Sequence, residues 1–152
     1  MSERSMDGFW RDGAHVLAAR VYHEDTDFTG IAYHGAYLRF AERGRTDFLY
    51  GVGLDHAELQ RGDAPLALVV ARMEMEFFAG ARIGERLEIV TRVASSSGAR
   101  VTFLQEIFRG DEGVLLWRGR VVIAAVSPAG RAVRLPLELR SALERDWSPP
   151  SA

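Results

Sequence analysis

Cysteine is absent from this 152-residue chain, so the chain cannot form a disulfide bond or a cysteine-ligated metal site. Lysine is absent as well, and all 19 basic residues are arginines. Codon bias is the simplest explanation of this imbalance, although it also supplies planar guanidinium groups that suit phosphate recognition. His15, His23 and His56 show no spacing typical of metal ligands, and we therefore predict that no metal is bound.

Long apolar runs are missing too. No segment approaches the roughly 18 consecutive apolar residues that a membrane-spanning helix requires. Residues 1–13 are polar and lack the apolar core of a secretory signal. We therefore expect a cytoplasmic protein that does not insert into the membrane, and the net charge of −2 argues against general nucleic-acid binding.

The length and the composition fit one domain that spans residues 1–152. Hydrophobic residues make up 47% of the chain, which is enough for a sizeable core. No repeat, low-complexity run or internal linker divides the sequence. We expect residues 1–12 and 147–152 to be loose ends.

Residues 35–50 are predicted to form one long helix. Its apolar residues recur at helical spacing and form a single stripe of Tyr37, Phe40, Ala41, Gly44 and Phe48. Glycine costs about 1 kcal/mol in a helix interior. Gly44 therefore predicts a close approach between this helix and a sheet.

The remaining pattern predicts strands. One strand at residues 16–22 precedes the helix, and alternating apolar and polar residues predict four more at about 69–77, 87–93, 100–109 and 114–126. Short turns between the last four favour an antiparallel meander, and a short helix is predicted at residues 136–145. One helix lying on a curved antiparallel sheet is an α+β arrangement.

Residues 20–46 hold the most informative pattern. The first strand leads into an acidic turn, Glu-Asp-Thr-Asp at residues 24–27, and Gly30 and an apolar link then bring His34 to the start of the long helix. A carboxylate is thus expected near a helix N-terminus, where backbone N–H groups lack intrahelical acceptors. Hydrolysis of an activated acyl group needs both, because the carboxylate attacks or activates water and the donors hold the oxyanion.

This stretch resembles the acyl-CoA thioesterases of the hot-dog fold, in particular the Tol–Pal-associated and 4-hydroxybenzoyl-CoA thioesterase group. The matching residues are Tyr22, the 24–27 turn, Gly30, Tyr33, His34, Tyr37, Phe40, Glu42, Arg43, Arg45 and Thr46. A weaker likeness continues to about Leu137. The resemblance implies a curved antiparallel sheet wrapped around one long central helix. It also implies hydrolysis of acyl-CoA to free acid and CoA, with no cofactor because CoA is part of the substrate.

The resemblance assigns roles around the acidic turn. Asp27 matches the catalytic carboxylate, which either attacks the thioester carbonyl or activates water, and Asp25 is then expected to hold the turn. Composition alone instead favours a turn-forming, capping role for Asp27. His34 is expected to point its backbone N–H at the thioester oxygen rather than to transfer a proton. Tyr33 either lines the thioester end of the pocket or packs as an ordinary aromatic residue.

Further substrate contacts are expected from Phe28, Tyr37 and the 66–70 run. Nothing strongly polar stands out among them, which predicts broad selectivity for short-to-medium aliphatic acyl-CoA thioesters. Ser97 and Arg100, in a serine-rich turn, are candidates for contacts with the phosphates of coenzyme A, and a plain hairpin turn is the alternative.

Other interpretations stay open at this point. The substrate could be an aromatic, 4-hydroxybenzoyl-type thioester, or the protein could be a binding module for acyl carrier protein or lipid-synthesis enzymes. Acyl-thioester dehydration is disfavoured by the Asp in the turn before the helix. Exposed sheet edges and the resemblance together predict a homo-oligomer, a dimer or a tetramer, in which Glu42 is a supporting or interface residue.

Overall fold

The computed structural model describes residues 7–110 and 112–144, apart from the side chain of Glu138. Its elements are β1 (Phe9–Arg11), β2 (Ala14–Arg20), the 3-10 turn η1 (His23–Asp25), α1 (Ala36–Gly51), α2 (His56–Arg61), β3 (Ala67–Phe77), β4 (Arg86–Ser97), β5 (Arg100–Arg109), β6 (Val114–Val126) and α3 (Leu137–Glu144). All strand pairs between these elements are antiparallel.

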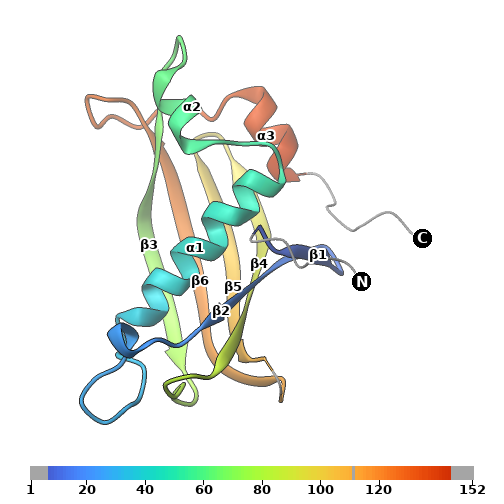
Figure 1. Ribbon diagram of the computed structural model, residues 1–152. Coiled ribbons are helices and arrows are strands. Elements are labelled where there is room, and N and C mark those ends of the chain that lie inside the picture. The colour runs from blue at the N-terminus through green and yellow to red at the C-terminus, as the bar shows by residue number, and fades with distance from the viewer. Residues whose placement is uncertain (1–6, 111, 145–152) are drawn as a thin grey trace.

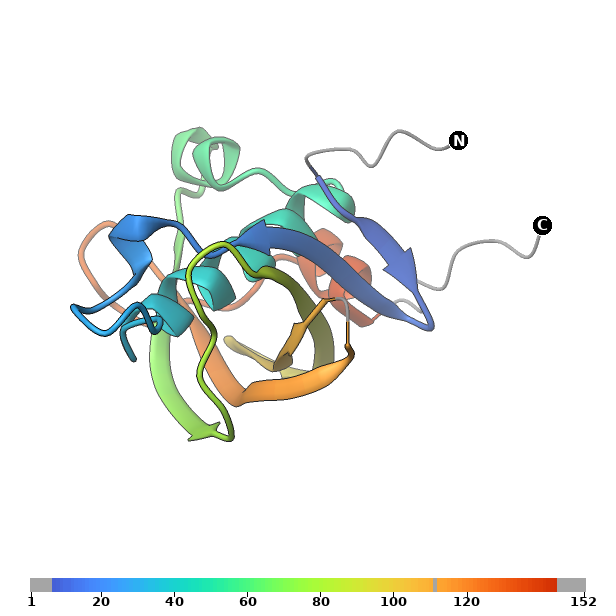
Figure 2. The ribbon, with the colours of Figure 1, turned by 60° about the horizontal axis from the view of Figure 1, so that its bottom comes forward.

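The strands form a curved sheet that wraps around α1, as Figures 1 and 2 show. Within the described residues the sheet has six strands in the order β1-β2-β4-β5-β6-β3. This is the α+β arrangement predicted from the sequence, and it is the curved sheet around one long helix that the resemblance implies. None of the helices in the described ranges is long and apolar enough to cross a membrane.

The strand order corrects one prediction. β4, β5 and β6 follow one another as a meander, but β3 pairs with β6 at the far edge and not with β4. The chain leaves β3 through the connection at residues 78–85 and crosses the open end of the sheet before β4 begins. β4 is the partner of β2 on its other side. The sequence pattern predicted β2 to β6 as strands but did not predict this crossing.

The N-terminal segment corrects a second prediction. Residues 9–11, expected to belong to a loose end, form β1 and pair with β2. Trp10 packs edge-on against His15 and Phe48, with ring centroids 5.2 Å apart in each case. Burial of these aromatic rings explains why the segment is held against the sheet. Residues 1–6 and 147–152 lie outside the described part of the chain.

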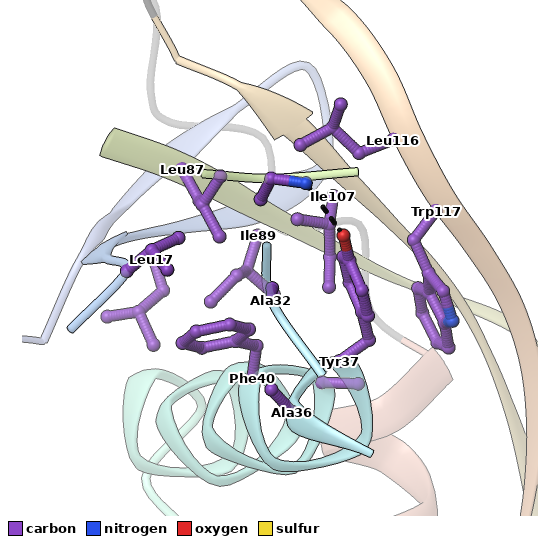
Figure 3. Close-up of a cluster of buried hydrophobic side chains, with 13 residues drawn as sticks. Leu17, Ala32, Ala36, Tyr37, Phe40, Leu87, Ile89, Ile107, Leu116 and Trp117 are labelled. Carbon is purple, nitrogen blue, oxygen red and sulfur yellow. Dashed lines mark hydrogen bonds between the residues drawn. The ribbon is translucent and has the colours of Figure 1, made fainter. Parts of the chain in front are cut away.

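The predicted apolar stripe of α1 faces the core. Tyr37, Phe40, Ala41, Gly44 and Phe48 are all buried. Around the first half of α1 they meet Leu17, Leu87, Ile89, Ile107, Leu116 and Trp117 (Figure 3). Around its second half a further cluster includes Phe103, Val121, Leu139 and Leu143, so α3 closes that end of the core.

Gly44 lies where the helix comes closest to the sheet, as predicted. A Cβ atom at this position would lie 2.6 Å from Ile89 Cγ2, 2.9 Å from Thr91 Oγ1 and 3.1 Å from Gln105 Nε2. These distances leave no room for a methyl group. The glycine therefore sets how deeply α1 sits in the sheet.

β3 is an edge strand whose exposed side chains are apolar near its two ends and charged between them, at Arg72, Glu74 and Glu76. Val69, Val70 and Phe77 keep 40%, 48% and 50% of their surface accessible. A bulge between Val70 and Arg72 shifts the register. A bulge inserts one unpaired residue into the strand. The alternate positions that face the core are therefore shifted by one residue after the bulge. An edge of this length is a natural pairing surface for another strand.

Candidate active site

A short hairpin carries the acidic turn to the start of α1. The Tyr33 N–H donates to the Asp25 carbonyl at 2.8 Å, and the Asp27 N–H donates to the Ile31 carbonyl at 2.9 Å. These bonds pair the acidic turn with the link that enters the helix. The backbone around Asp27 is therefore joined to the segment that enters the helix.

Asp27 presents an exposed, charged carboxylate on this hairpin. Its Oδ1 accepts hydrogen bonds from the Thr29 backbone N–H at 2.7 Å and from the Thr29 hydroxyl at 2.5 Å. The bonds from the Thr29 side chain and backbone lower the pKa of Asp27 below its ordinary value. Asp27 is therefore ionised at neutral pH, which is the form that both attack and water activation require.

Asp25 has the structural role predicted for it. Its side chain is buried, and its Oδ2 accepts a hydrogen bond from the Tyr22 N–H at 2.9 Å. Arg39 Nη2, on α1, lies 3.7 Å from Asp25 Oδ1. This carboxylate ties the end of β2 to the turn and to the helix, so two residues with the same chemistry two positions apart differ in exposure and in partners.

The N-terminus of α1 carries unpaired donors. Gly35 occupies the N-cap position, and no side chain caps the helix. The Ala36 N–H donates to the Tyr33 carbonyl at 2.8 Å, whereas no acceptor for the N–H of His34 or Gly35 is found in the described ranges. Two successive backbone donors at the positive end of a 16-residue helix form a suitable cradle for an oxyanion.

The side chains around this cradle are exposed and mostly apolar. The His34 and Tyr33 rings lie against each other with centroids 4.2 Å apart. Phe28, at the tip of the hairpin, is fully exposed, and Tyr33 and Ile83 are about half exposed at 49% and 50%. A thioester bound here would meet apolar surface on several sides, yet in a single protomer the site is open to water.

Tyr37, expected as a substrate contact, belongs to the core. It keeps only 2% of its surface exposed, and its hydroxyl accepts a hydrogen bond from the Ala81 N–H at 3.0 Å (Figure 3). Its ring meets Phe77 edge-on at 5.6 Å. Tyr37 thus fixes the loop after β3 to α1, and a direct contact with substrate stays a prediction.

Ser97 and Arg100 are not brought to Asp27 within the protomer. Both are exposed and lie at the hairpin between β4 and β5. In Figure 1 this hairpin is at the end of the molecule where α1 terminates, whereas the segment between η1 and α1, which carries Asp27, is at the end where α1 begins. Sixteen helical residues separate the two ends by about 24 Å. Their role in binding coenzyme A stays a prediction.

A buried polar network beneath α1 was missed. Arg45 Nη1 donates to Gln105 Oε1 at 3.0 Å, and Gln105 Nε2 donates to the Ala41 carbonyl at 2.8 Å and to Thr91 Oγ1 at 2.9 Å. The sequence did carry a signal, because Arg45 lies four residues after Ala41 and three before Phe48, on the apolar stripe of the helix.

Thr29 was also missed as the partner of Asp27. An Asp followed two residues later by Thr is a pattern typical of a local turn in which the carboxylate accepts backbone and hydroxyl hydrogen bonds. No group of His, Asp and Glu side chains suited to hold a metal ion occurs among the described residues. The Asp27 carboxylate and the two backbone donors at the start of α1 are groups that suit attack on an activated acyl group.

Several known proteins are similar in sequence to this chain. The model of the thioesterase-like superfamily matches residues 21–143. The acyl-CoA thioester hydrolase YbgC of Escherichia coli O6:H1 is 38% identical over 109 residues, which cover 72% of this chain and 79% of the relative. The acyl-CoA thioesterase YbgC of Haemophilus influenzae is 31% identical over 132 residues, which cover 86% of this chain and 95% of the relative.

Solved structures share the fold. A probable thioesterase from Bartonella henselae superposes with a TM-score of 0.77 at 40% identity, covering 81% of this chain and 99% of that one. Slr0204 from Synechocystis, a 1,4-dihydroxy-2-naphthoyl-CoA thioesterase, gives a TM-score of 0.79 at 23% identity. The superposition covers 86% of this chain and 95% of Slr0204. The second likeness concerns the fold alone. The chain therefore belongs to the thioesterase-like superfamily, and it is a hot-dog-fold hydrolase of the acyl-CoA thioesterase group.

Proposed function

We propose that this hydrolase acts on short-to-medium aliphatic acyl-CoA thioesters, with Asp27 as its catalytic carboxylate. The observation that carries the proposal is the pairing of an ionised, exposed carboxylate with the unpaired N–H groups of His34 and Gly35 on one short unit. The thioester oxygen is held by these donors, and Asp27 attacks the carbonyl carbon or removes a proton from the attacking water. The products are the free acid and CoA.

An aliphatic substrate is supported by the surroundings of Asp27. Phe28, Tyr33 and Ile83 are the exposed large side chains near it, and the Ile83 N–H donates to the Gly30 carbonyl at 3.1 Å. Apart from the Tyr33 hydroxyl and the His34 ring, this surface is apolar, and an apolar pocket discriminates only weakly between acyl chains. Contacts of the substrate with Phe28, Tyr33 and Tyr37 are part of this proposal.

We infer that the working form is a homo-oligomer. Hydrogen bonds to a developing charge are strong only where water is excluded, and a single protomer leaves Asp27 open to solvent. The unpaired edge of β3, with Val69, Val70 and Phe77 exposed, supports pairing with a second copy. A copy placed across this edge could also bring a β4–β5 hairpin, with Ser97 and Arg100, to the coenzyme. Light scattering should report a dimer or a tetramer.

The decisive experiment compares the exposed carboxylate of Asp27 with the half-buried carboxylate of Asp55. Asp27→Asn should abolish release of free CoA, measured with a thiol reagent, while the thermal midpoint stays unchanged. Asp55→Asn is a matched control, because Asp55 also accepts a hydrogen bond at 2.7 Å from the backbone N–H two residues on, but does so at the start of α2. Wild-type turnover by Asp27→Asn would refute the assignment.

The substrate class is tested with a panel of butyryl-, hexanoyl-, palmitoyl-, benzoyl- and 4-hydroxybenzoyl-CoA. We expect kcat/KM to vary modestly and to favour the short-to-medium aliphatic thioesters. A hundredfold preference for an aromatic thioester would overturn this choice. A cytoplasmic location, expected from the apolar runs that are missing, an association with Tol–Pal, expected from the resemblance, and the alternative of binding to acyl carrier protein all stay predictions.

A further inference from the structure

Three neighbouring strands each place an arginine at the same end of the sheet. Arg20 is the last residue of β2, Arg86 is the first of β4 and Arg109 is the last of β5, and β4 lies between the other two strands. The three arginines line a cleft of about 610 Å³, and neither Asp27 nor His34 lines it. Its volume falls in the range of about 300–1,000 Å³ that is common for small-molecule sites.

Two of these arginines face each other without a counterion. Arg20 and Arg86 are directly opposite in the antiparallel pairing of β2 with β4. Side chains at such positions share one face of the sheet, with Cβ atoms about 4.5–5.5 Å apart, and like charges there are destabilising. Arg20 Nη1 donates to the Gly84 carbonyl at 2.8 Å, which is a neutral acceptor. No carboxylate oxygen of the described residues lies within 4.0 Å of either guanidinium group.

The third arginine holds both carboxylates that line the cleft. Arg109 Nε donates to Glu85, and Arg109 Nη1 lies 3.5 Å from Glu112 Oε2. The acidic side of the cleft is therefore neutralised by Arg109. Arg20 and Arg86 are left as two adjacent cations that face the same space.

We propose that this cleft binds a phosphate group between Arg20 and Arg86. Planar guanidinium groups present pairs of N–H donors that match the oxygens of a phosphate. A phosphate monoester carries a charge of about −1.5 to −2 at pH 7, so one such group meets both cations. A carboxylate carries a single charge and would leave one of the two arginines unmatched. The ligand supplies the counterion that the described chain does not.

Two sources offer a phosphate group. One is the coenzyme of the substrate, which carries its phosphates at the far end of the arm from the thioester, and the other is free phosphate. The three strand ends are at the end of the molecule where α1 begins (Figure 1). Ile83 lines the cleft and donates its backbone N–H to the Gly30 carbonyl in the hairpin that carries Asp27. The cleft is thus next to the hydrolytic site of the same protomer, whereas Ser97 and Arg100 need a second copy to reach it.

Calorimetry with adenosine 3′,5′-bisphosphate and with adenosine tests the recognition of phosphate. We expect wild-type protein to bind the bisphosphate at least tenfold more tightly than adenosine, and Arg86→Gln to bind it at least tenfold more weakly than wild type. Arg92→Gln is the matched control, since Arg92 is on the same strand but donates to the Asp12 carbonyl at 2.7 Å and does not line the cleft. Equal binding of the two compounds by wild-type protein, or undiminished affinity in Arg86→Gln, would overturn the proposal.

Thermal melting of a second variant keeps the test valid if Arg86→Gln does not fold. Arg20 is exposed, so Arg20→Gln should fold normally. Phosphate should raise the Tm of wild type above the Tm in chloride, because a ligand that binds only the folded state stabilises it. The two salts are compared at equal ionic strength, which removes general screening. We expect a smaller rise for Arg20→Gln, and an equal rise in both proteins would refute a site at this pair.

Hydrolysis separates the two sources, and the coenzyme source rests on the proposed function. If the coenzyme supplies the phosphate, wild type should prefer hexanoyl-CoA in kcat/KM to S-hexanoylpantetheine, which lacks the phosphates. Arg86→Gln should then reduce this preference at least fivefold, through KM, and Arg92→Gln should keep it. If the phosphate is free, Arg86→Gln should weaken binding of inorganic phosphate and keep the preference. Either result supports the site, whereas failure to hydrolyse any thioester would weaken only the proposed function, because binding is measured without turnover.

Discussion

Gly44→Ala tests whether a single missing methyl group sets the depth of α1 in the sheet. A Cβ atom at this position would lie 2.6 Å from Ile89 Cγ2, far inside the optimal carbon–carbon separation of about 3.5–4.0 Å. Overpacking of this kind costs about 1–3 kcal/mol. The methyl group would also crowd Thr91 and Gln105, whose hydrogen bonds hold Arg45 and the helix backbone.

Helix propensity acts in the opposite direction. Alanine is favoured over glycine by about 1 kcal/mol in a helix interior. Breaking one buried hydrogen bond of Gln105 adds a cost of about 1–3 kcal/mol. The three contributions together predict that Gly44→Ala lowers the free energy of unfolding by about 3 kcal/mol, which corresponds to a fall of about 6–12 °C in Tm.

Urea denaturation and thermal melting measure this effect. Gly98→Ala is the matched control, because nothing lies within 4 Å of the added Cβ in the β4–β5 hairpin. This control should change stability by about 0.5 kcal/mol or less. If Gly44→Ala is as stable as the wild type or more stable, then the contact between α1 and the sheet at Gly44 has room for a methyl group and the reasoning is wrong.

Three further results are expected. Asp25→Ala leaves the partly buried Tyr22 N–H without its carboxylate acceptor and should lower the free energy of unfolding by about 1–3 kcal/mol; an unchanged urea midpoint would contradict this. His34→Ala should keep appreciable kcat, because the proposed donor is its backbone N–H, whereas a loss of about 10²–10⁴-fold would identify the side chain as a base. Burial lowers the pKa of His15 below its ordinary value of 6.5, so the unfolded chain binds the proton first. Its contribution to stability is complete above about pH 6.5 and is lost as the pH falls below that value toward the folded pKa, and Tm against pH should show this slope in wild type but not in His15→Gln.

The hairpin that carries Asp27 was predictable in part. Asp27 and His34 are seven residues apart in sequence, and backbone bonds within residues 25–33 hold them in one unit. Local patterns report such short-range structure well, because turns and helix starts depend on neighbouring residues. The exposure of Asp27 and the burial of Asp25 could not be predicted, since packing against β2 and Arg39 decides them.

The sequence by itself determined the elements that depend on periodicity and on local turns. The stripe from Tyr37 to Phe48 predicted α1, and the alternation at residues 100–109 and 114–126 predicted β5 and β6 with the bounds that the structure has. Gly44 also predicted a close contact between the helix and the sheet, although not the sheet residues that make it. These signals are local because side-chain direction repeats along a single helix or strand.

Tertiary structure alone decided the features that depend on pairing between distant segments. β3 lies beyond β6 because of a crossing connection, and β1 joins the sheet through the aromatic contacts of Trp10. Arg45 became a buried cation facing a cleft because α1, β5 and β3 meet around it. No periodic pattern in the sequence predicts these contacts. The free energy that stabilises them comes from surfaces that are far apart in sequence and are buried together only in the folded chain.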